Sequence, residues 1–306
     1  MFAQIFSIVA VMFVLVFVGI FIRHIKIINK NFTRNLSSLL VLVTFPALIF
    51  YSMITQFSRG MILDALILII FGVLVCFLGY IIGLFLSLFL KLKNTERNTF
   101  LILCAFGNTS FLSIPIGFAL YGMDAVIKII LFDFGCNIVL WTFGIWLISS
   151  HQSDELKNSF VKNIFNPGIV ALIIGLAVVM SNFKLPKVFT ESCKLLGSIT
   201  IPMSLIATGS LLYGVGFRRQ TKRRTLIALT AGKLVVMPLL AISILSIIDI
   251  SVSVRNIIVL EAAMPSMVFS TILAEKYNSD SNLAASGVCL TTLVSVLTVP
   301  IFLSFV

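Results

Sequence analysis

Long apolar segments separated by short polar connections make up almost the whole chain. A run of about 20 apolar residues has the length of a helix that crosses a bilayer. Ten such runs are expected, near residues 2–22, 36–55, 62–90, 99–121, 126–149, 165–182, 195–213, 225–248, 256–274 and 283–306. The first run lacks a basic leader and a small-residue cleavage site, which favours a retained helix over a signal peptide. The pattern therefore predicts an all-α polytopic membrane protein with ten transmembrane helices.

Two of these segments contain poor helix formers near their centres. The fourth holds the stretch GNTSFLSIPIG, from Gly107 to Gly117, and the ninth holds EAAMPSMVFST, with Pro265 and Ser266. Backbone that leaves the helix at this depth is tolerated only inside protein or against a water-filled cavity. The N-terminus of each resulting half-helix would carry a positive partial charge and free N–H donors, which suit an anionic group. The plainer alternative is that Pro115 and Pro265 only kink packed helices.

Similar residues recur at an offset of about half the chain. Pro46 and Pro202 are 156 residues apart, and Arg97 and Arg255, which open segments four and nine, are 158 apart. Because five is an odd number, a second set of five helices would enter the membrane from the opposite side, which predicts two inverted five-helix repeats. Chance similarity among apolar helices is the alternative. The expected division is a first repeat at 1–150, a short cytoplasmic connection at 151–164 and a second, inverted repeat at 165–306.

Composition and charge support a membrane protein and indicate its orientation. Of 306 residues 59% are hydrophobic and only 11% are charged, which is too few charges for a soluble protein. The net charge of +11 lies in the short connections, so it is interpreted as a topology signal and not as a nucleic-acid site. Fifteen of the 22 Lys and Arg residues fall in odd-numbered connections and six in even-numbered ones. This bias predicts a multi-pass protein of the cell membrane with both termini extracytoplasmic.

Three ionisable residues, Asp133, Lys233 and Glu261, fall well inside apolar segments. Each costs about 2.5–3.5 kcal/mol near the centre of a membrane helix, so each needs a partner or a cavity. The charges suggest substrate binding coupled to a proton or to Na⁺, and the alternative is a structural pair between Lys233 and a carboxylate. The scattered cysteines suggest neither a disulfide nor a metal site, and no cofactor is expected. The predicted substrate-binding residues lie at the interruptions or one turn from Asp133: Gly107, Asn108, Thr109, Ser110, Pro115, Asn137, Met264, Pro265 and Ser266.

The segments GNTSFLSIPIGFALYG, FNPGIVALIIGL and EAAMPSMVFSTILAEKY, followed by LTTLVSVLTVP, resemble the auxin efflux carrier family of permeases. Their order and spacing match over essentially the whole chain. The resemblance implies crossed, broken helices four and nine, with the crossover at Gly107–Pro115 and Met264–Ser266, and an elevator-like alternating access. It also implies a small organic anion as substrate, since plant members export auxin and bacterial members are often labelled malate or malonate permeases. The same analogy suggests a homodimer.

The leading hypothesis is thus a secondary transporter for a small carboxylate, with the anion and the lipid bilayer as its partners. The long central loop of many plant members is missing, which leaves auxin itself unsupported as the substrate. A cation/proton antiporter on a related crossed-helix fold is the alternative. An enzyme is disfavoured because the two histidines, His24 and His151, lie in predicted loops and acidic residues do not cluster. A receptor or assembly factor on the same scaffold stays open.

Overall fold

The computed structural model describes residues 2–149, 167–183, 185–215 and 221–305, and these residues form helices joined by short turns. The predicted cytoplasmic connection at 151–164 lies outside the described residues. The first half contains α1 (Phe2–His24), α2 (Lys30–Leu39), α3 (Phe45–Gln56), α4 (Ile62–Phe89), α5 (Asn94–Ala105), α6 (Ser113–Tyr121), α7 (Met123–Val139) and α8 (Ile145–Ser149). The second half contains α10 (Pro167–Ser181), α11 (Lys187–Val215), α12 (Arg223–Ala231), α13 (Met237–Leu245), α14 (Val252–Ala262), α15 (Phe269–Lys276) and α16 (Ser281–Leu303).

Three single π-helical turns join some of these helices end to end. They are η1 (Leu40–Thr44), η3 (Leu140–Gly144) and η5 (Gly232–Val236). With these turns included, seven described helical stretches are long and apolar enough to cross a membrane: Phe2–His24, Lys30–Gln56, Ile62–Phe89, Met123–Ser149, Lys187–Tyr213, Arg223–Leu245 and Ser281–Leu303. The other three predicted segments correspond to α10, which has 15 residues, and to the interrupted pairs α5–α6 and α14–α15. A helical, multi-pass membrane protein is therefore confirmed.

Several helices begin earlier than the apolar pattern predicts. The second begins at Lys30 instead of residue 36, and the seventh at Lys187 instead of residue 195. The apolar run marks only the residues that lie in the hydrocarbon core of the bilayer. The helix itself extends further toward its N-terminus, through polar residues, as far as its cap. At the start of α2 the side chain of Asn29 supplies that cap by accepting a hydrogen bond from the N–H of Phe32 at 2.9 Å.

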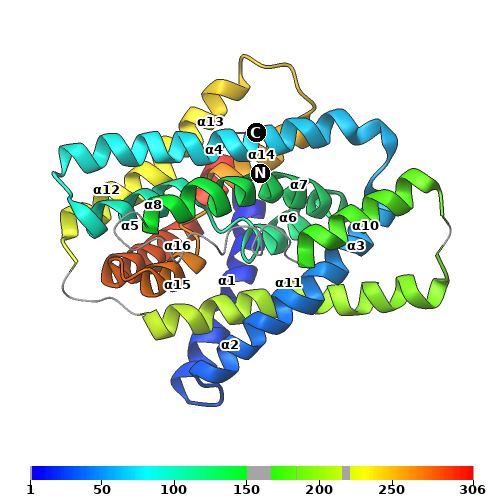
Figure 1. The fold of residues 1–306 in the computed structure, drawn as a ribbon, viewed down its shortest axis with the longest axis horizontal. Helices are drawn as coiled ribbons and strands as arrows, with labels where there is room; N and C mark the ends of the chain where they lie inside the picture. The colour runs from blue at the N-terminus through cyan, green and yellow to red at the C-terminus, as the bar shows by residue number, and fades with distance from the viewer. Residues whose placement is uncertain (1, 150–166, 184, 216–220, 306) are drawn as a thin grey trace.

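The helices pack into two groups that each combine parts of both chain halves. In the first, which we call the scaffold group (α1, α2, α3, α10 and α11), α1 lies along α11 and α3 packs against both α10 and α11. In the second, which we call the crossing group (α4–α8 and α12–α16), α4 packs against α5 and α7 and α16 packs against α5, α12 and α15. Figure 1 shows α3 and α10 on the right of the molecule, α5, α12, α15 and α16 on the left, and α11 running across below them.

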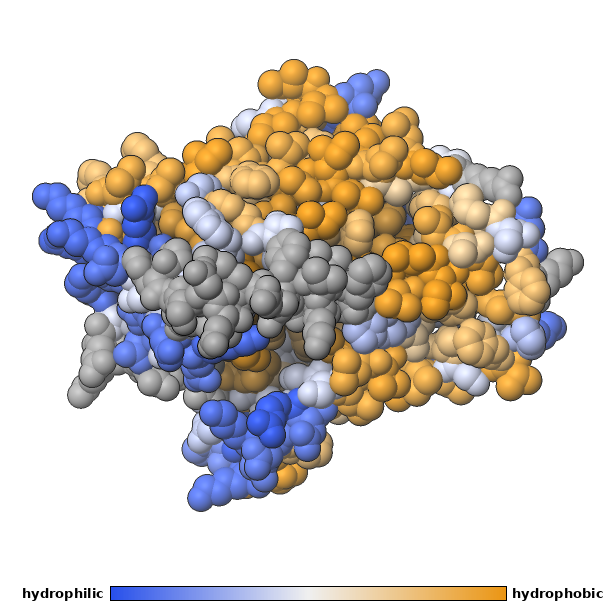
Figure 2. Space-filling model, in the orientation of Figure 1, coloured by the Kyte–Doolittle hydropathy of each residue, from blue (hydrophilic) through white to orange (hydrophobic). Residues whose placement is uncertain are grey.

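The surface matches an environment of lipid. Figure 2 shows apolar side chains over most of the face in view, with hydrophilic residues at one edge and over α2. Large apolar side chains such as Phe21, Phe85 and Phe89 are exposed on single helices. An apolar surface this extensive is rare on soluble monomers.

Two pairs of helices, one member of each from either half of the chain, begin at the same spacing. Asn94 opens α5 and Val252 opens α14, 158 residues later, and the same 158 residues separate Met123 at the start of α7 from Ser281 at the start of α16. The spacing of 158 residues seen between the arginines in the sequence therefore recurs in the helix boundaries.

Close backbone contact between α1 and α11 leads to a first prediction. A Cβ atom on Gly209 would lie 2.8 Å from the carbonyl carbon of Val16, so a side chain has no room. We expect Gly209→Val to lower the free energy of unfolding by about 1–3 kcal/mol or more, because overpacking forces the backbones apart. Thermal unfolding in detergent measures this. Gly60→Ala is the control, since its Cβ would have Ser58 Oγ at 3.8 Å as its nearest neighbour. Equal melting temperatures for the two variants would contradict the packing.

Candidate functional site

Both predicted interruptions are present. The helix α5 ends at Ala105 and α6 begins at Ser113, while α14 ends at Ala262 and α15 begins at Phe269. The residues in between leave the helical conformation, and most of them are buried. The interpretation of these two sequence stretches as mere kinks is therefore wrong. In each half of the chain, several consecutive residues between two helices are not helical.

The two unwound segments pair with each other. The backbone N–H of Asn108 donates to the carbonyl of Pro265 at 2.8 Å, and the N–H of Met267 donates to the carbonyl of Phe106 at 3.0 Å. These reciprocal bonds form a short antiparallel β-bridge between segments that are far apart in the sequence. Backbone groups released from two helices thus satisfy each other in the interior, as a low-dielectric environment requires.

Local sequence accounts for where the helices stop. Gly107 and Asn108 are poor helix formers, and Pro265 lacks an N–H and disfavours helical backbone at Met264 before it. The expected crossover at Gly107–Pro115 was too long, because Pro115 lies in the first turn of α6. Proline is tolerated there since the N–H groups of a first helical turn have no partner within the helix.

Asp133 on α7 supports the first unwound segment. Its carboxylate accepts hydrogen bonds from the hydroxyls of Thr109 and Ser110, the latter at 2.9 Å. The side-chain amide of Asn137 donates to the same carboxylate at 2.9 Å and to the carbonyl oxygen of Asp133 at 2.8 Å. The predicted shared face of Asp133 and Asn137 is confirmed, and the pair holds the loop that leads into α6.

Ser266 and Thr291 support the second unwound segment. The hydroxyl of Ser266 donates to the carbonyl of Leu103 in the last turn of α5 at 2.8 Å, and its backbone N–H donates to Thr291 Oγ1 on α16 at 3.2 Å. Sequence reasoning identified Ser266 but missed Thr291. The offset of 158 residues would have found it, because it carries Asp133 onto Thr291.

Glu261 lies in the last turn of α14 and reaches the start of α6. Its carboxylate accepts a hydrogen bond from the hydroxyl of Ser113, the first residue of α6. A negative charge at a helix N-terminus is stabilised by the helix dipole. Glu261 is 1% exposed, so its carboxylate lies in the interior beside the first unwound segment.

Lys233 contacts backbone rather than a carboxylate. It lies in the π-helical turn η5, is 2% exposed, and its Nζ donates to the carbonyl of Cys104 at 3.1 Å. No ion pair joins Lys233 to Asp133 or Glu261, all three of which are described. The alternative of a structural pair between Lys233 and a carboxylate therefore does not take the form of a direct ion pair in the described residues. The C-terminal end of α5, with its partial negative charge, takes the ammonium instead.

Two polar atoms at the break have no hydrogen-bond partner among the described residues. They are Nδ2 of Asn108, whose side chain is buried, and Oε2 of Glu261. Leaving such a group unpaired costs about 1–3 kcal/mol, so atoms of this kind point to a ligand or a proton at the site. The N-termini of α6 and α15 begin beside the unwound segments and supply positive partial charge. The break therefore offers one unpartnered donor, one unpartnered acceptor and the N-terminus of α15 to a ligand.

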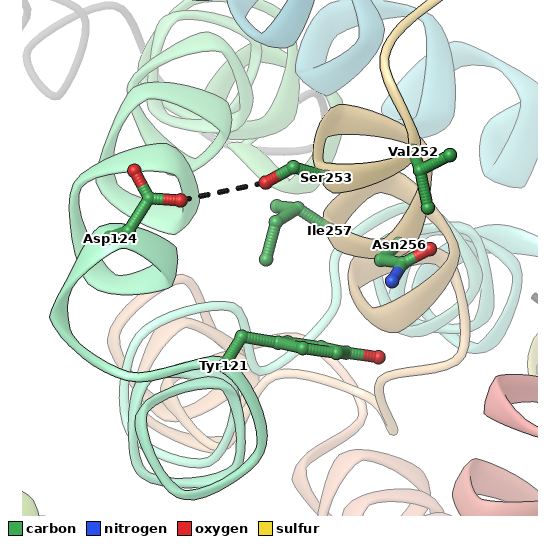
Figure 3. A pocket seen from close by; sticks show the side chains of 6 residues that line it. All are labelled: Tyr121, Asp124, Val252, Ser253, Asn256 and Ile257. Atoms are coloured by element: carbon green, nitrogen blue, oxygen red, sulfur yellow. Dashed lines mark hydrogen bonds between the residues drawn. The ribbon is translucent and has the colours of Figure 1, made fainter.

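A separate cavity lies at the opposite ends of α6 and α14. It has a volume of about 420 Å³ and is lined by Tyr121, Asp124, Val252, Ser253, Asn256 and Ile257. Figure 3 shows Asp124 from the start of α7 pointing toward Ser253 of α14, 3.5 Å away, with Tyr121 below them. None of the predicted site residues lines this cavity.

Lys128 is a buried charge that the sequence analysis missed. It was counted among the connection residues, but it lies in α7, is 5% exposed, and pairs with Asp124 at 2.5 Å and with Ser253 Oγ at 2.6 Å. The signal for it was the spacing of Asp124 and Lys128, four residues apart and so on one helix face. Of the six charges assigned to even-numbered connections, at least four lie within described helices: Lys128 in α7, Lys187 and Lys194 in α11, and Arg255 in α14.

The hydrogen bonds of Asp133 generate a second prediction. We expect Asp133→Ala to lower the free energy of unfolding by about 2–4 kcal/mol, since Thr109, Ser110 and Asn137 lose their common acceptor. Amide hydrogen exchange over residues 106–112 should rise as well, because the loop loses its support. The control is Asp249→Ala, at an exposed aspartate outside the break. Unchanged exchange in the Asp133 variant would show that the loop is held without it.

Comparison with known proteins agrees with this geometry. A model of the family described as membrane transport protein matches residues 4–303. An uncharacterized transporter of Methanocaldococcus jannaschii is 24% identical over 97% of each chain. An uncharacterized transporter of Methanothermobacter thermautotrophicus is 23% identical over 94% of each chain. The chain belongs to the membrane transport protein family, the family of the auxin efflux carriers that its motifs resemble.

Proposed function

We propose that this protein is a secondary active carrier that moves a small organic anion, a carboxylate, across the cell membrane. The single observation that carries the proposal is the pair of unwound segments joined by the bonds between Asn108 and Pro265 and between Met267 and Phe106. Discontinuous membrane helices whose N-termini point at an anionic group are a recurring design of secondary transporters. Membership of a transport family supports the same reading.

We infer that the two interrupted helices and α10 also cross the bilayer, which together with the seven long stretches gives ten spans. α5 and α6 have 12 and 9 residues, and α14 and α15 have 11 and 8. At 1.5 Å per residue each pair provides roughly 30 Å of helix, about the thickness of the hydrocarbon core. The break between the two half-helices then falls near the midplane.

The proposed architecture is two inverted repeats of five spans. The spacing of 158 residues links the starts of α5 and α14, the starts of α7 and α16, and the supporting residues Asp133 and Thr291. Each of these two residues holds the unwound segment of its own chain half. A common origin of the two halves explains why equivalent helices carry equivalent supports.

Alternating access by an elevator-like movement fits the way the helices are grouped. The candidate site belongs entirely to the crossing group, and the scaffold group covers it from one side through contacts such as that between Phe45 and Phe111. If the crossing group slides along the scaffold group, the site changes sides without coming apart. A proton or Na⁺ would couple this movement to a gradient, and both termini would lie outside the cytoplasm.

A cation/proton antiporter is the second candidate. The observation in its favour is the presence of two carboxylates, Asp133 and Glu261, beside the break. Against it, Asp133 already accepts hydrogen bonds from three neutral side chains, which leaves it little capacity to bind an ion. Proton and Na⁺ flux measured in liposomes with and without a carboxylate separates the two.

A screen for stabilising carboxylates tests the proposed site. All five cysteines are buried, so a thiol-reactive dye reports unfolding of the purified protein. We expect a small carboxylate to raise the melting temperature of the native protein and to raise that of Asn108→Ala much less, because the variant lacks the unpartnered amide. Asn35→Ala, an exposed residue of α2, is the control and should respond like the native protein. Equal stabilisation of all three proteins would remove Asn108 from the site.

Transport itself is tested with the anion that the screen identifies. Liposomes that contain the protein should show saturable, anion-selective uptake under a proton or Na⁺ gradient. If the protein binds the anion but shows no such flux under either gradient, the carrier proposal is contradicted and a receptor is the better interpretation.

Cross-linking tests the movement. The side chains of Ser52 on α3 and Met123 on α7 touch at 3.4 Å across the two groups, whereas Phe50 on α3 and Phe189 on α11 lie in the scaffold group with ring centres 5.6 Å apart. We expect a short bifunctional thiol reagent to abolish flux in Ser52→Cys/Met123→Cys and to spare it in Phe50→Cys/Phe189→Cys. Full flux in the first cross-linked variant would contradict an elevator movement.

A further inference from the structure

The ammonium of Lys233 lies where a transporter of this design would hold a coupling cation. We propose that Lys233 is a built-in cation of the crossing, which occupies the C-terminal end of α5 so that no Na⁺ is needed there. The inference rests on the proposed carrier function and deepens it, because it names the residue that removes one class of coupling ion.

The last turn of α5 shows how completely its carbonyl groups are used. The carbonyl of Ile102 accepts from the N–H of Phe106 at 3.0 Å and that of Leu103 from the hydroxyl of Ser266 at 2.8 Å. The carbonyl of Cys104 accepts from Lys233 Nζ at 3.1 Å. The end of a helix leaves its final carbonyls without partners in the helix, and together they carry a partial negative charge. Lys233 is the charged member among the groups that satisfy them.

The ammonium also lies close to the first unwound segment, next to Gly107. A Cβ atom on Gly107 would be 3.6 Å from Lys233 Nζ and 3.7 Å from the carbonyl oxygen of Glu261. Unwound carbonyls and half-helix C-termini are the groups that coordinate Na⁺ or a proton carrier in transporters with broken helices. The position thus has the chemistry of a monovalent cation site, and the chain fills it with its own side chain.

The helix that carries Lys233 is built to bring it there. Lys233 belongs to the π-helical turn Gly232–Val236, directly before α13, in which Pro238 cannot donate a backbone hydrogen bond. Single π-turns inside helices change which face a side chain presents and are frequent at functional sites. Gly232 lets this turn approach α4, since a Cβ there would lie 2.7 Å from Leu86 Cδ1. Close packing against α4 holds the lysine at the crossing.

A tethered ammonium differs from a bound ion in one respect that matters for transport. It compensates the charge of the α5 terminus in every state of the carrier and cannot leave with the cargo. Glu261, whose carboxylate oxygen Oε2 has no partner among the described residues, would then lie near a positive charge that is part of the chain. Coupling by Na⁺ at the α5 terminus is therefore excluded, and the carrier should be indifferent to Na⁺ at this position.

Removal of the lysine tests the inference without any knowledge of the cargo. The probes are NaCl, KCl and methylammonium chloride, each compared with choline chloride at equal ionic strength, and the readout is thermal unfolding with the thiol-reactive dye. Native protein should melt at the same temperature in all four salts. Lys233→Ala should melt lower in choline by about 5 °C or more and regain at least half of this loss in Na⁺ or methylammonium.

Lys233→Met is the matched control. It removes the same charge but keeps the volume of the side chain, so no cation has room and no salt should restore its stability. Stabilisation of the native protein by Na⁺ over choline would overturn the proposal. So would a folded Lys233→Ala that responds to no cation, or one that responds no more than Lys233→Met. If the alanine variant does not fold, the native protein decides: indifference to Na⁺ supports the proposal and stabilisation overturns it. A failure to find any transported anion would leave these results unchanged, so the two proposals fail separately.

Discussion

Backbone groups that leave a helix inside an apolar interior must find hydrogen-bond partners, and the structure depends on how this requirement is met. Two interruptions meet in the middle of the crossing group and exchange bonds between Asn108 and Pro265 and between Met267 and Phe106. Either unwound segment alone would leave backbone N–H and C=O groups unpaired in the interior. Each segment supplies one N–H donor and one carbonyl acceptor to the other, so the two interruptions stabilise each other and link the two halves of the chain.

The supports around the pair differ in charge between the halves. Asp133 and Thr291 are 158 residues apart and do the same structural work, but one is ionisable and the other neutral. The second half contributes Glu261 and Lys233 instead. The two halves of the chain therefore carry different charges at the crossing, even where their supporting residues occupy corresponding positions.

Sequence alone was sufficient for the parts of the site that follow from backbone chemistry. Gly107, Asn108 and Pro265 are poor in helices for local reasons, so both interruptions could be predicted, and the four-residue spacing of Asp133 and Asn137 gave their contact. The helix starts were predicted less well, because hydropathy marks the hydrocarbon boundary and not the cap.

Partners that come from distant helices could not be predicted in this way. For Lys233 the sequence left two possibilities, a role in substrate binding and a structural pair with a carboxylate, because a charge inside a membrane needs a partner or a cavity. Lys233 donates to the carbonyl of Cys104, and this choice depends on the π-turn η5 and on where α5 ends, neither of which is visible in an apolar pattern. Lys128 was assigned to a connection because it lies near the end of an apolar run, where charged residues usually mark a connection. Its ion pair with Asp124 shows that it is a buried residue of α7.

The distribution of bonds between the two helix groups bears on how the site could change sides. The hydrogen bonds that hold the break, from Asn108, Ser266 and Lys233, all stay within the crossing group. Contacts with the scaffold group include the ring pair Phe45–Phe111 and the weak contact of Ser52 with the sulfur of Met123. Apolar contacts of this kind are not directional, so they can be exchanged for similar ones without leaving a polar group unpaired. A sliding movement would therefore keep the buried hydrogen bonds of the crossing group intact and would exchange only its apolar contacts with the scaffold group.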